Sequence, residues 1–119
     1  SSDVCSSDLS WRDLLPMIGS AACVVCPDSS VLHAAAYWPS VPVVGLWGPF
    51  GWKSRALYYH NHTPLTTDAC PFAPCYTQYN ELPRSKCEKP DGYDPKSDSC
   101  TALSAIAPEA IIGAVLKRI

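Results

Sequence analysis

Two apolar runs, joined by a polar turn and an alanine-rich segment, constrain the fold of this chain more than any other feature. The first run, residues 22–26, ends in Pro-Asp-Ser-Ser, and the second, residues 41–47, ends in Gly-Pro. Residues 31–38 lie between them and have the composition of a short helix. A strand, a turn, a helix and a second strand in this order form one βαβ unit, so we expect an α/β fold with a parallel sheet.

The turn after the first run predicts an anion site. Ser29 and Ser30 would place hydroxyl groups and unpaired backbone N–H groups at the start of the helix, where the helix dipole also favours negative charge. Gly48 and Pro49 end the second run at the carboxyl edge of the sheet, which is the edge where open α/β sheets bind ligands. A simpler interpretation, in which Asp28 and Ser29 only cap the helix, stays open.

The remaining expected elements are short. The strand at 22–26 is apolar on both faces, as expected of a central parallel strand. Its Cys23 and Cys26 would point to opposite faces, so we interpret them as core residues rather than as a metal or redox pair. We expect a helix that begins at Trp11, is capped by Ser10, is kept short by Pro16 and ends at Gly19-Ser20. The other expected elements are a helix at 52–59, a turn at 60–63 with the glycosylation sequon Asn61-His62-Thr63, a strand at 64–67, and a helix from Pro108 to the end.

The first and the last of these helices each have an apolar side, which predicts packing against the rest of the fold. We interpret the last helix as a packing element without chemistry. The apolar side chains are Leu14, Leu15, Met17 and Ile18 in the first helix, and Ile111, Ile112, Val115, Leu116 and Ile119 in the last.

Composition and charge argue against some classes of function. The net charge of −2, without a basic block, argues against nucleic-acid binding driven by charge, and no apolar run approaches the ~20 residues of a transmembrane helix. Residues 1–9, SSDVCSSDL, lack periodicity and look like the translation of a sequencing-library adapter. We therefore expect them to be non-native and residues 10–119 to form one domain whose upstream part is missing.

Four cysteines lie in a loop at residues 70–100 that is rich in Pro, Lys, Asp and Tyr. Cys70, Cys75, Cys87 and Cys100 can form a structural four-thiolate zinc site, two disulfides, or a group of thiols held close together. A loop of this length needs such a staple inside a compact domain. The spacings alone do not decide among the three arrangements.

Two stretches of the chain resemble a known family. The stretch PDSSVLHAAAYWPSVPVVGLWGP resembles the C-terminal domain of glycosyltransferase family 9, the heptosyltransferase-like enzymes of bacterial lipopolysaccharide synthesis. The tail CTALSAIAPEAIIGAVLKRI looks like the family's cysteine-containing lead into its terminal helix. The resemblance implies a Rossmann-like parallel sheet flanked by helices, as the C-terminal half of a glycosyltransferase-B fold. Ser30 departs from the family's usual glycine, and Phe50 stands where a small hydroxyl residue is usual.

The resemblance also implies a function. The chain would be a glycosyltransferase fragment that binds a nucleotide-diphosphate sugar donor, heptose-like, for transfer to a lipopolysaccharide or other glycan acceptor. It would act in the cytoplasm, at the inner face of the membrane, with a peripheral membrane contact through the missing N-terminal domain. The family's catalytic base belongs to that domain, so no catalytic residue is assigned here. The residues carried over as donor-binding are Asp28, Ser29, Ser30, His33, Gly48 and Pro49.

No cofactor is expected for catalysis, and a structural zinc at the four cysteines is the one metal considered. A second function stays open beside the first. In this alternative the chain is a non-catalytic α/β binding module whose loop is stapled by cysteines.

Overall fold

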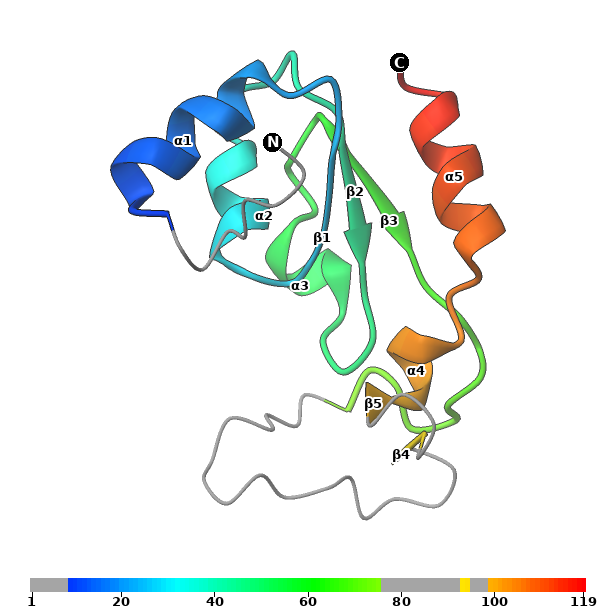
Figure 1. Ribbon diagram of the computed structural model, residues 1–119. Helices are drawn as coiled ribbons and strands as arrows, with labels where there is room; N and C mark the ends of the chain where they lie inside the picture. The colour runs from blue at the N-terminus through cyan, green and yellow to red at the C-terminus, as the bar shows by residue number, and fades with distance from the viewer. Residues whose placement is uncertain (1–8, 76–92, 95–98) are drawn as a thin grey trace.

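The structure, a computed structural model, describes residues 9–75, 93–94 and 99–119 (Figure 1). Its main body is a sheet of three parallel strands in the order β1-β2-β3, and β4 and β5 form a separate antiparallel pair. The elements are α1 (Trp11–Ser20), β1 (Val24–Pro27), α2 (Ser30–Ala35), β2 (Val43–Leu46), α3 (Trp52–Arg55), β3 (His62–Leu65), β4 (Tyr93–Asp94), β5 (Ser99–Cys100), α4 (Thr101–Ser104) and α5 (Pro108–Leu116).

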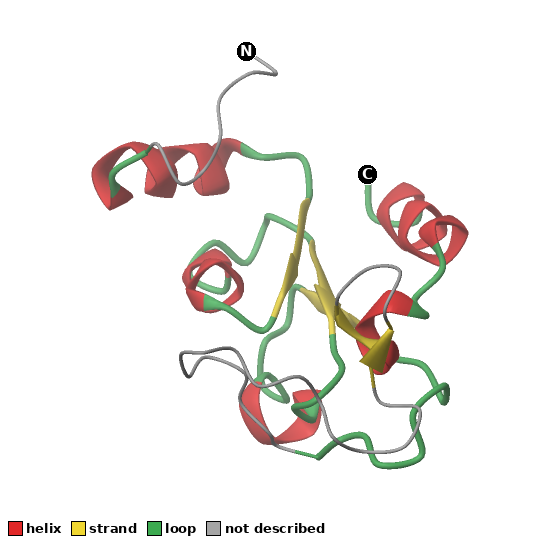
Figure 2. Cartoon of the chain, turned by 60° about the horizontal axis from the view of Figure 1, so that its bottom comes forward, coloured by secondary structure: helices red, strands yellow, loops and turns green. Residues whose placement is uncertain are grey.

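Helices flank the parallel sheet on both sides, which confirms the predicted α/β class. Helices α1 and α2 lie together on one side, where α2 packs on β1, whereas α5 lies on the other side against β2 and β3 (Figures 1 and 2). Helices α3 and α4 lie beyond the carboxyl ends of the strands (Figure 1). None of the helices in the described ranges combines the length and the apolar character needed to cross a bilayer.

The core forms where α1 and α2 meet the sheet. The strand β2 is central and buried, and Val43 and Val44 are among its best-covered side chains. Burial of such apolar side chains supplies most of the free energy that holds a fold of this kind together. The buried cluster consists of Ile18, Cys26, Leu32, Ala35, Val43, Trp47 and Ala56.

Proline occurs in the two strands that flank β2 and not in β2 itself. Pro27 ends β1, and Pro64 lies within β3 opposite Gly45. Because proline has no N–H to donate to a ladder, it is tolerated on edge strands and excluded from central ones. The turn predicted at 60–63 is confirmed at residues 60 and 61 and is wrong at 62 and 63, because β3 begins at His62, two residues before the predicted strand.

The helix α1 begins at Trp11 and ends at Ser20, both as predicted. The Ser10 hydroxyl accepts a hydrogen bond from the Asp13 backbone N–H, as expected of an N-cap. The helix continues through Pro16 to Ser20, and the Ser20 hydroxyl donates to the Pro16 carbonyl. Ile18 is buried, whereas Met17 is 51% exposed, so the predicted apolar side is wrong at that residue.

Residues in three segments that the sequence predicts to be buried are more exposed than expected. The strand β1 lies at the edge of the described sheet and not at its centre, so Val25 is 43% exposed, although Cys26 is buried. Cys23 precedes β1 and is half-buried. In α5 the small Ala114 is the buried residue, because this side of the helix faces β2 and β3. The predicted side chains that are exposed at the C-terminal end are Ile112, Leu116 and Ile119.

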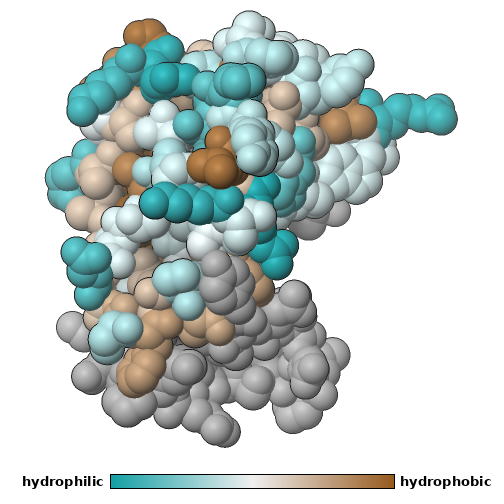
Figure 3. Space-filling view, turned by 180° about the vertical axis from the view of Figure 1, so that it is seen from behind, coloured by the Kyte–Doolittle hydropathy of each residue, from teal (hydrophilic) through white to brown (hydrophobic). Residues whose placement is uncertain are grey.

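The exposed apolar residues do not merge into one broad surface on the face opposite that of Figure 1. On this rear face the strongly hydrophobic residues form separate brown spots among white and teal ones (Figure 3). The other element bounds differ from prediction by a few residues. Helix α2 ends at Ala35, β2 spans four residues, α3 ends at Arg55, and a short β4–β5 pair lies within the loop predicted at 70–100.

Candidate functional site at the carboxyl edge of the sheet

The strand register brings the two motifs singled out in the sequence to one edge. Pro27 pairs with Leu46 in the parallel ladder, so the Asp28 turn and the Gly48 turn leave the sheet side by side. The same register pairs Leu46 with Leu65, so the segment after β3 emerges at this edge as well. The carboxyl ends of parallel strands are the usual place for a ligand in such a sheet.

A hydrogen-bonded group forms around Asp28. The His33 Nε2 lies 3.1 Å from Asp28 Oδ1, and the Arg55 Nε lies 3.4 Å from Asp28 Oδ2. The His33 Nδ1 lies 2.8 Å from the Tyr59 hydroxyl oxygen. Because a carboxylate can only accept, Nε2 donates to Asp28, and a neutral imidazole then accepts at Nδ1 from Tyr59. Both ring nitrogens of His33 are therefore engaged by protein groups.

Ser29 and Ser30 open α2 without capping it through a side chain. Ser29 is the N-cap residue with an extended backbone, and its side chain makes no capping hydrogen bond. The first N–H groups of any helix lack partners within the helix. Ser29 therefore occupies the N-cap position without a side-chain capping bond, and the Asp28 carboxylate contacts His33 and Arg55.

Phe50 lies at the same edge of the sheet, in contact with Arg55. The Arg55 guanidinium carbon lies 4.4 Å from the centre of the Phe50 ring, within cation–π distance. Phe50 also packs against the buried cluster. The residue that departs from the family pattern thus helps to hold the arginine that contacts Asp28.

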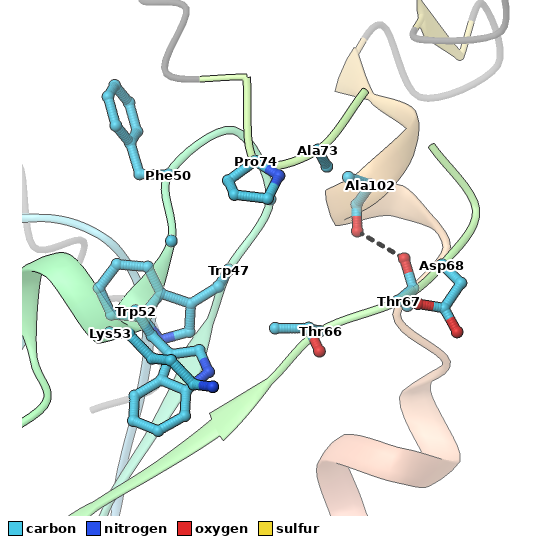
Figure 4. Close-up of a pocket in the computed structure, with 12 residues that line it drawn as sticks. Trp47, Phe50, Trp52, Lys53, Thr66, Thr67, Asp68, Ala73, Pro74 and Ala102 are labelled. Carbon is cyan, nitrogen blue, oxygen red and sulfur yellow. Dashed lines mark hydrogen bonds between the residues drawn. The ribbon is translucent and has the colours of Figure 1, made fainter. Parts of the chain in front are cut away.

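A cavity of about 350 Å³ lies beside this group. Its walls come from the segment after β2, the segment after β3, and the region of α4 (Figure 4). Gly48 belongs to its lining, whereas Asp28, Ser29, Ser30, His33 and Pro49 do not. The lining residues are Trp47, Gly48, Phe50, Gly51, Trp52, Lys53, Thr66, Thr67, Asp68, Ala73, Pro74 and Ala102.

Trp47 and Trp52 form an aromatic wall of the cavity, and the His62 ring lies against both indole rings. The Trp47 indole N–H donates to His62 Nε2 at 2.9 Å, and the two rings meet edge to face. The Trp52 ring centre lies 6.3 Å from that of His62. Burial lowers the pKa of His62, and the nearby His33 lowers it further, so the imidazole is kept in the neutral form that can accept from Trp47.

Gly45 leaves room for this contact. A Cβ atom at Gly45 would overlap both the His62 imidazole and the Trp47 indole. On the other side of the cavity, the Thr67 hydroxyl donates to the Ala102 carbonyl at 3.0 Å and so ties the segment after β3 to α4 (Figure 4).

Sequence reasoning missed most of the cavity. Gly51-Trp52-Lys53-Ser54 resembles the end of a phosphate-binding loop but lacks the required spacing, yet Lys53 does line the cavity. His62 gave no signal because it fell in an expected turn. The paired tryptophans that end and follow an apolar strand were the one available sign of an aromatic wall.

The cysteines of the predicted staple lie partly outside the described residues, since Cys87 is not among them. Cys70 is buried and Cys100 is half-buried, and neither is in a disulfide. Within the described ranges, no three His, Cys, Asp or Glu side chains are grouped so that they could hold a metal ion. The four-thiolate site therefore stays a prediction.

Comparisons with known proteins add no family. No family model matches the chain, and neither a curated protein nor a solved structure matches it significantly.

Proposed function

We propose that this chain binds the nucleotide-diphosphate sugar donor of a glycosyltransferase, and that the donor lies along the carboxyl edge of the β1-β2-β3 sheet. The observation that carries the proposal is the register of β1 and β2. It brings the turn with Ser29 and Ser30 beside the turn with Gly48, and the sequence resemblance assigns both turns to the donor. Transfer itself would require a base and an acceptor site from a further domain.

In this proposal the Ser29–Ser30 turn receives the diphosphate. The hydroxyl of Ser29 makes no capping bond, and Ser30 is exposed, so both hydroxyls are available to phosphate oxygens. The N–H groups at the start of α2 add donors, although a helix of six residues contributes only a weak dipole. The diphosphate charge that develops on the leaving nucleotide would be stabilised by these groups.

His33 and Asp28 have supporting roles in this proposal. Because His33 is hydrogen-bonded at both nitrogens, it fixes Asp28 and Tyr59 rather than the phosphate. Arg55 is held by Asp28 and Phe50 at the same edge. Its positive charge lies close to where the diphosphate would bind and would attract it over a short range.

The experiment is a binding titration of the full chain with ADP-, UDP- and GDP-linked sugars, compared between two aspartate variants. Ser29→Asp puts a negative charge at the proposed diphosphate position and is expected to weaken binding at least about tenfold. Ser40→Asp makes the same change of net charge in the exposed turn beyond the other end of α2 and is expected to leave binding unchanged. Equal affinities of the two variants, or no binding of any of the three donor classes, would contradict the proposal.

A further inference from the structure

The cavity beside the Asp28 group has chemistry of its own. It lies between Trp47, Trp52 and Lys53 on one side and Thr67, Asp68 and Ala102 on the other, with Thr66 between them (Figure 4). A volume of about 350 Å³ is at the lower end of the range for small-molecule pockets. The lining residues limit the kind of ligand that can bind in it.

Trp47 closes the cavity from the core side, since it is only 2% exposed, and it offers no hydrogen-bond donor to a ligand. The Trp47 N–H is already used by His62, and the edge-to-face contact of the two rings fixes the indole. Trp52 is half-buried and packs against the core. Since Trp52 is held by the core and keeps part of its ring exposed, it favours a ligand that presents a flat or apolar face.

Three polar groups of the lining are not paired with protein within the described part of the chain. The Lys53 ammonium has no carboxylate partner there, and it lies 5.8 Å from the Trp52 ring centre, at the outer limit of a cation–π contact. Neither the Thr66 hydroxyl nor the Asp68 carboxylate makes a hydrogen bond to another described residue. Thr67, by contrast, is engaged with Ala102.

The order of Lys53, Thr66 and Asp68 along the cavity limits the kind of ligand that can bind there. Lys53 favours an anionic substituent at the tryptophan side, because an ammonium is a strong partner for phosphate. Asp68, on the far side, repels a second anion and accepts hydrogen bonds from hydroxyl groups. Thr66, which lies between them, can donate or accept. A ligand with one anionic end, several hydroxyls and an apolar face satisfies all three.

We propose that this cavity binds a glycosyl phosphate, with the phosphate at Lys53, the sugar hydroxyls at Thr66 and Asp68, and the apolar face of the sugar ring against Trp52. The inference rests on the proposed function in one respect, since the glycosyl phosphate is taken to be the sugar half of the same donor. The diphosphate of the donor would then lie between the two sites, with its nucleotide-side phosphate at the Ser29–Ser30 turn of the neighbouring strand end and its sugar-side phosphate at Lys53.

The test uses the tryptophan indole N–H signals of the isotope-labelled full chain in NMR spectra. The probes are glucose 1-phosphate, mannose 1-phosphate and galactose 1-phosphate at millimolar concentration, with inorganic phosphate and methyl glucoside as partial ligands. At least one hexose phosphate is expected to shift the indole signal of Trp52, which Trp52→Phe identifies by its loss. The signal of Trp11, which is 48% exposed in α1, is expected to stay in place.

Two further variants test binding at the cavity without a change in the buried core. Lys53→Ala and Thr66→Val change exposed residues, so the fold is expected to persist. Lys53→Ala should weaken binding of the hexose phosphate about tenfold, and Thr66→Val should weaken it severalfold. Lys117→Ala, which removes an exposed lysine just after α5, should have no effect. If none of the three hexose phosphates moves the Trp52 signal, or if Lys53→Ala matches Lys117→Ala, the proposal is overturned.

The outcome also separates this inference from the proposed function. If a nucleotide sugar binds and Ser29→Asp abolishes its binding while Lys53→Ala does not weaken it, the donor proposal stands and the glycosyl phosphate site is wrong. If a hexose phosphate binds at Trp52 while none of the ADP-, UDP- and GDP-linked sugars binds, the cavity proposal stands and the donor proposal is wrong.

Discussion

At the scale of single residues, His62 is the side chain on which the aromatic wall depends most. It accepts the Trp47 N–H only while it is neutral. The charges and titratable groups near it include His33, whose charge lowers the pKa of His62 further. A histidine that is harder to protonate in the folded chain than in the unfolded chain links stability to pH.

We therefore predict that the chain becomes less stable as the pH falls below about 6.5, the ordinary histidine pKa. The unfolded chain then takes up a proton that the folded chain resists, so protonation favours unfolding; above this pH the stabilisation is fully present. The midpoint of thermal unfolding, measured from pH 7.5 to pH 5, should decline through this window. His62→Gln, which can accept from Trp47 without titrating, should flatten the decline.

The matched control is His60→Gln, because His60 is exposed and next to the same strand. This variant should keep the decline of the parent chain. A pH dependence that is the same in His62→Gln as in the parent would show that other groups cause it.

At the scale of elements, glycine has opposite roles in β2 and α5. Gly45 lies in the central strand, where an added Cβ would overlap Trp47 and His62. Gly113 lies in α5, where an added Cβ meets nothing within 4 Å. Substitution of the glycine by alanine should thus change the free energy of unfolding in opposite directions at the two positions.

We predict that Gly45→Ala lowers the free energy of unfolding by about 1–3 kcal/mol, because the wall must shift to admit the methyl group. Gly113→Ala should raise it by about 0.5–1 kcal/mol, because alanine favours the helix. Urea titration of the two variants and the parent measures both changes. A stabilising Gly45→Ala would mean that Trp47 and His62 do not meet as described.

Elements were also where prediction from the sequence succeeded best. The βαβ order, the Ser10 cap and the parallel sheet all follow from local patterns, since apolar runs and capping residues act within a few positions. The cavity did not follow, because Thr67 meets Ala102 across 35 positions and Trp47 meets His62 across 15. The exposure of Val25 was missed because the pattern of a strand does not reveal whether it lies at the centre or at the edge.

At the scale of the whole molecule, Asn61 joins segments that are far apart in sequence. It is buried, with 3% exposure. Its side-chain nitrogen lies within 3.2 Å of the Ala35 and Trp38 carbonyls and 2.7 Å from that of Val41. The residue thus connects the end of α2 and the approach to β2 with the start of β3.

We predict that Asn61→Ala lowers the free energy of unfolding by about 1–3 kcal/mol, because buried carbonyls lose their donor. Denaturant unfolding followed by circular dichroism measures the loss. Ser40→Ala, in the exposed turn between α2 and β2, serves as the control and should change it by less than about 0.5 kcal/mol. Equal stabilities of the two variants would contradict the proposed role of Asn61.

Asn61 is also the acceptor position of the Asn-His-Thr sequon, and its burial has a practical consequence. An oligosaccharide on its side-chain nitrogen would occupy the space between α2 and β3 and would remove a donor that three carbonyls share. A secretory host that modifies the nascent polypeptide would therefore produce glycoforms that cannot mature. Recombinant production is better directed to a bacterial host, where this competition does not arise.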